Sequence, residues 1–154
     1  MDADRLSHRF PVLYHMAEDE SWQSIRQIGL LSTSALLDRF GIQGDRRYDI
    51  ESRRRPEIVK IEHPEHGTAL IRDNKPMQET ALERCLQGMT PREWYEGLNR
   101  KVFFWVDRER LSRLLGARAY RDRPHLVLEV GTETDTRNCV HKIAEVDTLV
   151  RSNS

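Results

Sequence analysis

Residues 90–116 read TPREWYEGLNRKVFFWVDRERLSRLLG, and this stretch predicts a helix, a strand and a second helix in succession. Thr90 is a typical N-cap residue, a proline follows at the first helical position, and Glu93 completes a capping box. The run 102–106 is β-branched and aromatic, which predicts a buried strand. Residues 107–116 begin with a capping aspartate, carry inward-facing leucines and end at a glycine, as a short helix does.

Patterns on both sides of this stretch predict the remaining elements. Helices are predicted where apolar residues recur every three or four positions, and strands where they are continuous or alternate with polar residues. The predicted helices are 21–29, 34–40 and 77–86, and the predicted strands are 11–15, 57–62, 68–73, 125–130 and 140–143. Because strands and helices do not strictly alternate, we expect an α+β fold with a small, twisted, mostly antiparallel sheet and several flanking helices.

Residues 41–56 show no periodicity and contain two glycines and two clusters of arginine, so a flexible, arginine-rich loop is predicted there. The run Arg53-Arg54-Arg55 is open to two interpretations. Such a run usually forms a solvated face, and the alternative is a loop that folds over a phosphate group.

The length of the chain, 154 residues, favours one domain over residues 1–154, because domains commonly have about 100–150 residues. The net charge is zero, so no overall field attracts nucleic acid or membrane. Of the 25 basic residues 21 are arginine, which genomic base composition can explain without a functional cause. No signal peptide and no run of about 18 apolar residues is recognised, which predicts a cytoplasmic protein that does not enter a membrane.

The sequence contains none of the strong local motifs for nucleotide binding, metalloprotease or serine hydrolase chemistry. His63 and His66 are three residues apart but flank Pro64 in an apparent turn, where exposed polar residues are usual, so no metal is expected. Cys85 is predicted on the apolar face of a helix, where a thiol is usually inert, and Cys139 is isolated from it.

Two strand ends carry polar side chains that a ligand could meet. Tyr14 and His15 end the first predicted strand and would offer a phenol and an imidazole side by side. The alternative for His15 is a partly buried ring that is hydrogen-bonded to the backbone. Arg72, Asp73 and Asn74 end another strand, where the alternative is an ordinary turn.

Several strings resemble an uncharacterised bacterial family of unknown function. The resemblance covers most of residues 12–130, and its strings begin at Leu13-Tyr14-His15, Ser21-Trp22, Gly29-Leu30-Leu31-Ser32-Thr33, Ile71-Arg72-Asp73, Thr90-Pro91, Leu98-Asn99 and Arg110-Leu111. Its opening is in turn remotely similar to that of ADP-ribosyltransferases, including toxins that modify DNA. In those enzymes a first strand ending in Tyr-His or a similar pair precedes a helix and a Gly-Leu turn.

The similarity implies an ADP-ribosyltransferase-like fold that uses NAD as substrate and modifies an unknown macromolecule, with nucleic acid among the candidates. It implies that Tyr14 and His15 bind NAD, with His15 at the ribose on the adenosine side. It also implies that Ser32 or Thr33 adds polar contacts and that Phe104 or Trp105 packs against nicotinamide. It further implies that Arg72 pairs with the pyrophosphate or the developing charge. Glu129 is the candidate for the late carboxylate, with Glu145 in reserve. A toxin or defence role would fit such an enzyme.

The family pattern continues past an Asn-Ser-Gly-like segment, whereas this sequence stops at Asn153-Ser154. Either the chain is truncated or this member is short, and a carboxylate in the missing part would leave a chain that binds without turnover. Two other functions stay open: a non-catalytic nucleotide- or nucleic-acid-binding module on the same fold, and a hydrolase that acts on nucleic acid through the arginine-rich loop. The hydrolase would bind with strong salt dependence.

Overall fold

The structure, a computed structural model, describes residues 3–74, 77–118, 120–132 and 143–149. Within these ranges the chain forms seven α-helices and five strands, and the strands make two small antiparallel sheets. The predicted α+β class is therefore confirmed. The chain divides into two compact units: unit 1 is Met1–Asp19 with Phe103–Ser154, and unit 2 is Glu20–Val102. A single domain over residues 1–154 stays a prediction.

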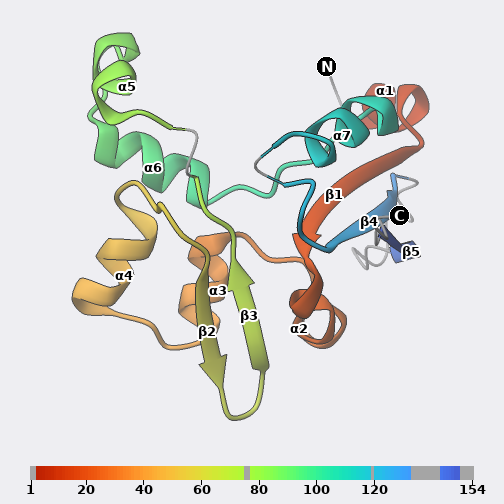
Figure 1. Ribbon diagram of the computed structural model, residues 1–154, viewed down its shortest axis with the longest axis horizontal. Helices are drawn as coiled ribbons and strands as arrows, with labels where there is room; N and C mark the ends of the chain where they lie inside the picture. The colour runs from red at the N-terminus through yellow and green to blue at the C-terminus, as the bar shows by residue number, and fades with distance from the viewer. Residues whose placement is uncertain (1–2, 75–76, 119, 133–142, 150–154) are drawn as a thin grey trace. The chain divides into compact units, whose positions relative to one another are not determined.

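Unit 1 contains a three-stranded antiparallel sheet in the order β1-β4-β5 (Figure 1). Its strands are β1 (Val12–Glu18), β4 (His125–Gly131) and β5 (Ile143–Leu149), and its helices are α1 (Ala3–Arg9) and α7 (Arg108–Leu115). β1 and β4 pair along their whole length, from Val12 opposite Gly131 to Glu18 opposite His125. The first helix, α1, has no counterpart among the sequence predictions.

Helix α7 packs on one face of this sheet through the leucine stripe that its sequence predicted. Leu111 is 1% exposed and belongs to a core cluster with Met16 of β1 and Val127 of β4. Full burial of such a side chain contributes about 1.5–3 kcal/mol. The stripe therefore determines which face of β1 and β4 is covered by a helix.

Unit 2 contains a β-hairpin and five helices. In chain order they are α2 (Trp22–Ile28, after a 3₁₀ turn at Asp19–Ser21), α3 (Thr33–Arg39), α4 (Gly44–Glu51), β2 (Val59–His63), β3 (Gly67–Ile71), α5 (Glu79–Cys85) and α6 (Pro91–Asn99). The predicted strands 57–62 and 68–73 thus pair with each other and form a second sheet, in place of the one sheet expected. One face of the hairpin shares a core with α3 and α4, whose buried members are Leu37, Phe40, Ile50, Ile61, Ala69 and Ile71.

A buried polar hub holds the segment after α4 in place. Arg55 is 7% exposed, and its guanidinium donates hydrogen bonds to the carbonyl oxygens of Ile50 and, at 2.8 Å, of Arg72. Asn99 of α6 accepts weaker bonds from the same guanidinium at 3.4 and 3.5 Å and donates to the carbonyl oxygen of Glu51 at 2.8 Å. Burial lowers the pKa of Arg55 to about 10, so the side chain is still a cation at neutral pH.

The capping box predicted at Thr90 is present in full. The Thr90 hydroxyl accepts from the Glu93 backbone N–H at 3.2 Å, and the Glu93 carboxylate accepts from the Thr90 backbone N–H at 2.8 Å. These bonds satisfy two of the backbone donors that the first turn of a helix leaves unpaired. The Thr90 backbone N–H and hydroxyl both donate to the Glu93 carboxylate and lower its pKa, so the contribution of Glu93 to stability is present above its ordinary pKa and decreases as the pH falls below it.

We therefore expect Thr90→Ala to reduce the free energy of unfolding by about 1 kcal/mol, the usual cost of losing an N-cap side chain. Urea denaturation followed by circular dichroism measures this change. Thr80→Ala is the matched control, because Thr80 lies inside α5 and its side chain caps no helix. An effect of Thr90→Ala no larger than that of the control would show that the capping box does not stabilise the chain.

Two predicted elements differ in the structure. The segment predicted as a loop over 41–56 contains helix α4, whose Ile50 is 2% exposed in the unit 2 core. Residues 102–106 do not form a buried strand: only Trp105 makes a bridge, and Phe103 is 56% exposed. In both places the contacts with distant segments decided the structure, and these are not visible in the local pattern.

Cys85 is also placed differently from the prediction. It is exposed at the end of α5, where Leu82 is the buried residue of the helix. The predicted apolar face is therefore narrower than the sequence pattern indicated. Cys139, like the predicted strand residues 140–142, lies outside the described residues.

Candidate functional site

The residues proposed from the sequence to bind NAD belong to both units. Tyr14, His15, Phe104, Trp105 and Glu129 are in unit 1, and Ser32, Thr33 and Arg72 are in unit 2.

His15 lies in the middle of β1, and its ring is fixed by the segment that follows α6. The Nδ1 atom is 2.9 Å from the carbonyl oxygen of Phe103. A carbonyl oxygen only accepts, so Nδ1 carries the proton and Nε2 is the acceptor nitrogen of the neutral ring. The alternative interpretation of His15, a ring that is hydrogen-bonded to the backbone, is thus present in the structure, and its contact with a ligand stays a prediction.

The segment 103–106 is aligned with β1 by one pair of backbone hydrogen bonds. Tyr14 and Trp105 exchange them in both directions, each at 2.8 Å. The alignment brings the Phe104 ring to 5.7 Å from the His15 ring, centroid to centroid, in a tilted orientation. His15 and Phe104 are therefore the two proposed NAD contacts that the structure places together.

Tyr14 and Trp105 face the opposite side of the sheet. Both pack on the core cluster beneath α7, with Met16 and Leu111. Side chains alternate along a strand, so consecutive residues such as Tyr14 and His15 point to opposite faces. The expectation that a ligand would meet their phenol and imidazole side by side was wrong.

Glu129, the proposed catalytic carboxylate, lies on the same face as Tyr14. It stands opposite Tyr14 in the β1–β4 register, and its Oε1 atom is 3.5 Å from Nη1 of Arg108 in α7. The register therefore places it on the face away from His15. Its reserve, Glu145, is opposite Glu129 in the β4–β5 register.

The three candidates in unit 2 have structural roles in their surroundings. Ser32 is the N-cap of α3, where its hydroxyl accepts from the Ala35 backbone N–H at 3.3 Å, and Thr33 is the first residue of that helix. Arg72 follows β3, and its carbonyl oxygen is one of the acceptors of the Arg55 hub. The cap explains a serine at position 32 without a ligand, whereas the Arg72 bond is made by its backbone and does not explain its side chain.

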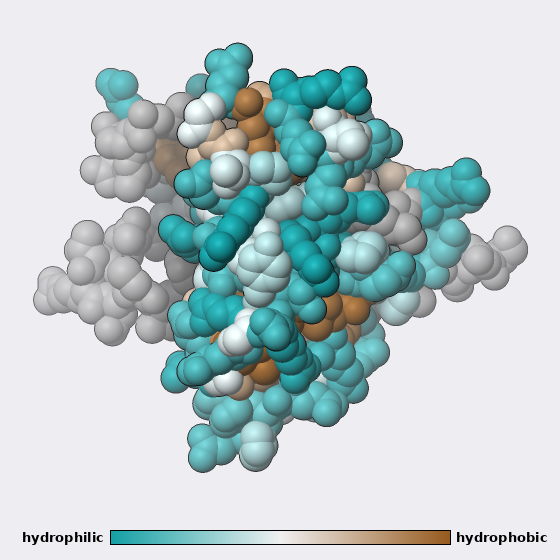
Figure 2. Space-filling model, turned by 90° about the vertical axis from the view of Figure 1, so that its left-hand side faces the viewer, coloured by the Kyte–Doolittle hydropathy of each residue, from teal (hydrophilic) through white to brown (hydrophobic). Residues whose placement is uncertain are grey.

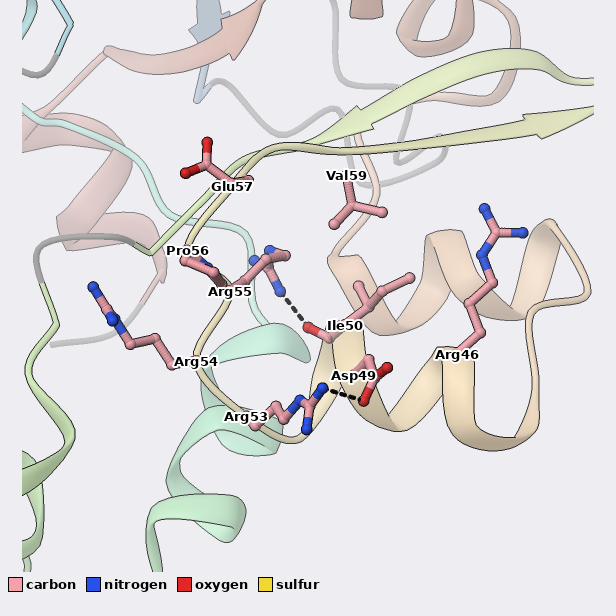
Figure 3. Close-up of a pocket in the computed structure, with 9 residues that line it drawn as sticks. All are labelled: Arg46, Asp49, Ile50, Arg53, Arg54, Arg55, Pro56, Glu57 and Val59. Carbon is pink, nitrogen blue, oxygen red and sulfur yellow. Dashed lines mark hydrogen bonds and ion pairs between the residues drawn. The ribbon is translucent and has the colours of Figure 1, made fainter.

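The arginine-rich segment lines a pocket of about 300 Å³ beside α4 (Figure 3). The charged heads do not converge on it: Arg55 turns toward the Ile50 carbonyl, and Arg53 pairs with Asp49 at 2.7 Å. Figure 3 shows the side chains of Arg46 and Arg54 extending on opposite sides of the pocket. This geometry does not favour the phosphate-binding interpretation, because an anion clamp needs donors that point at one place.

A buried polar group that the sequence prediction missed lies at the far end of the β1–β4 pair. Glu18 and His125 are opposite each other in register and are 5% and 2% exposed. His125 Nε2 donates to the Tyr120 carbonyl oxygen at 2.9 Å, while its Nδ1 is 3.9 Å from Glu18 Oε2. The Nη2 atom of Arg123 lies 4.0 Å from Oε1 of Glu18. No local signal marks the group, because its members meet only once the two strands pair.

The face of the molecule drawn in Figure 2 has no broad hydrophobic area. Hydrophobic residues appear there only in small separate areas among hydrophilic ones. Of the helices described, α6 is the longest with nine residues, whereas a membrane span needs about 20. No described helix is therefore long and apolar enough to cross a membrane.

These features define an α+β protein with an oriented histidine on the first strand of a small antiparallel sheet. The ring of Phe104, from the segment after α6, lies beside this histidine. The chain belongs to the family of unknown function DUF7002, which matches residues 11–154 and so includes every described element except α1. The expected membership of an uncharacterised family is thus confirmed. No curated protein and no solved structure matches the chain.

Proposed function

We propose that this protein is an ADP-ribosyltransferase-like enzyme that binds NAD on the His15 face of β1 and transfers ADP-ribose to a macromolecule. One observation carries the proposal. The His15 ring is oriented by the bond from its Nδ1 to the Phe103 carbonyl oxygen and lies 5.7 Å from the Phe104 ring, so an imidazole and an apolar ring stand side by side. An imidazole can bond to a ribose hydroxyl, and an aromatic base can pack on an apolar ring.

The reaction would break the bond between nicotinamide and the ribose carbon. The bonding electrons leave with nicotinamide, and a nucleophile of the acceptor forms the new bond to the cationic ribose carbon. Catalysis of this step requires negative potential fixed beside the ribose. His15 would orient the ribose and Phe104 would pack against nicotinamide, whereas Glu129 is not assigned the carboxylate role because it lies on the α7 face.

The position of Glu129 favours a second candidate function, a nucleotide-binding module without catalysis. Such a module needs the contacts of His15 and Phe104 and does not need a carboxylate near the ribose. The two functions share the binding step and differ in whether nicotinamide is released.

We expect the chain to bind NAD and His15→Ala to weaken this binding at least fivefold, a loss of about 1 kcal/mol. Isothermal titration calorimetry of NAD into both proteins measures it. His8→Ala is the matched control, because His8 is an exposed histidine of α1 in the same unit, and it should leave the affinity unchanged. No heat and no thermal shift at millimolar NAD would refute the transferase and leave a binding module for another nucleotide or for nucleic acid as the better candidate.

Nicotinamide release then separates the two functions. Incubation with NAD labelled in the nicotinamide ring, with cell extract as the source of acceptors, should give release that His15→Ala suppresses if the chain is a transferase. Binding without release, in the wild type and under the same conditions, would identify a binding module.

A further inference from the structure

The turn of the β2–β3 hairpin gathers three side chains whose functional groups are typical metal ligands. His63 ends β2, Glu65 and His66 form the turn, and Gly67 begins β3 with a φ of 70°, a backbone conformation that favours glycine. One nitrogen or oxygen atom from each of His63, Glu65 and His66 lies within 4.8 Å of the other two. The tight turn thus brings together residues that the sequence analysis interpreted as exposed polar groups.

The surroundings hold this arrangement in place. The His63 and His66 rings are stacked at 4.5 Å with an interplanar angle of 16°. Both rings also contact Phe40, a core residue that is 5% exposed, at 5.8 and 5.9 Å. Gln27 of α2 donates to the backbone carbonyl of Glu65 at 2.8 Å. Ring packing and a backbone anchor therefore keep the two histidines beside each other at the turn. Because a metal ion lies in the plane of each imidazole that binds it, the rings must turn out of the stacked orientation when one ion is bound.

The ligand set agrees with the chemistry of zinc and related divalent transition metals. Two imidazoles and one carboxylate form open zinc sites in which further positions are filled by water or substrate. In a tetrahedral site with bonds of about 2.1 Å, ligand atoms are about 3.4 Å apart. The present separations of up to 4.8 Å require the ligand atoms to approach one another by up to about 1.4 Å. Glu65 is exposed and both histidines are partly exposed, so they are accessible for this movement.

One hydrogen bond already involves a ring nitrogen of His63. The Glu65 backbone N–H donates to His63 Nδ1 at 3.2 Å, so Nδ1 presents its lone pair to the turn and Nε2 carries the proton of the neutral ring. A metal ion at Nδ1 would replace this hydrogen bond. The bond is long and exposed, and its loss is a small cost beside a metal–nitrogen bond.

We infer that the hairpin turn is a binding site for one divalent transition-metal ion of the zinc class, with His63, Glu65 and His66 as its protein ligands. The site lies outside the residues assigned to NAD and does not depend on that assignment. It revises the sequence-based expectation of no metal, because the spacing of His63 and His66 did not indicate that Glu65 joins them.

The test is titration of zinc chloride into the full chain after removal of metals with a chelator. Calorimetry should give one zinc per chain, and His66→Ala and Glu65→Gln should each weaken binding at least tenfold. Glu65→Gln keeps the shape of an exposed side chain, so it distinguishes a lost ligand from a misfolded chain. Circular dichroism spectra should be the same for both variants and the wild type.

His8→Ala and Cys85→Ser are the controls, since both side chains are exposed and either could bind zinc nonspecifically. Both should retain the wild-type affinity. Cobalt(II) bound in place of zinc should show no sulfur-to-metal charge-transfer band, because the proposed ligands contain no thiolate. Binding that survives His66→Ala and Glu65→Gln, binding lost in Cys85→Ser, or no stoichiometric binding at all would each overturn the inference.

Discussion

Replacing Arg55 by alanine should destabilise the protein by about 3–5 kcal/mol, the cost of removing one partner from a buried charged network. The guanidinium satisfies the carbonyl oxygens of Ile50 and Arg72 and the side-chain oxygen of Asn99, in a place where the residue is only 7% exposed. Alanine would leave these acceptors buried without their donor. Urea denaturation of the purified chain measures the change.

Arg53→Ala is the matched control two residues earlier. Its ion pair with Asp49 has both side chains about half exposed, and such pairs contribute about 0.5 kcal/mol or less. Arg55→Lys should also be strongly destabilising, because an ammonium group keeps the charge but cannot reach several acceptors with a planar fork of donors. A free energy of unfolding for Arg55→Ala within about 1 kcal/mol of the wild-type value would refute the structural role of the hub, because a loss of that size corresponds to a single hydrogen bond.

Replacing His125 by alanine should cost about 2–4 kcal/mol, from the cavity and from the lost hydrogen bond together. His125 is 2% exposed, donates to the Tyr120 carbonyl oxygen and packs edge-on against the Tyr120 ring at 6.0 Å. The substitution would also remove the ring whose Nδ1 atom lies 3.9 Å from Oε2 of the buried Glu18 carboxylate. Thermal and urea denaturation at pH 7 should both report the loss.

His8→Ala provides the comparison for this prediction, because His8 is exposed on α1 and should change stability by less than about 0.5 kcal/mol. His125→Gln retains an N–H donor and part of the volume, so its stability should lie between those of the wild type and His125→Ala. Equal stability of the alanine variants at positions 8 and 125 would show that the strand-end group is not part of the stabilising core.

The elements that the sequence predicted well are those with local causes. The capping box at Thr90 depends on residues three positions apart, and it is present in the structure as predicted. The strands predicted over 57–62 and 68–73 are both present, and the short turn between them lets them pair with each other. Arg55 shows the opposite case: it belongs to a charge run typical of a solvated face, yet its acceptors come from three other segments.

The candidate site could be predicted only in part, for the same reason. The sequence indicated His15 and Phe104, and the structure places their rings together. It also indicated Tyr14 and Glu129, which the alternation of β1 and the register with β4 place on the other face. Alternation is a property of the sequence and argued against the pairing of Tyr14 with His15, whereas the face of Glu129 depends on a register that no local pattern fixes.

The order of the segments has a consequence for how the protein folds. Unit 2 is one continuous stretch, Glu20–Val102, whereas unit 1 joins Met1–Asp19 to Phe103–Ser154. During synthesis the contacts within unit 2 can form as soon as it has left the ribosome, but β1 must wait until β4 has been made before the two strands can pair. Closing this long loop is slow relative to pairing between neighbouring segments. We therefore expect β1, the strand that carries His15, to join its sheet late in folding.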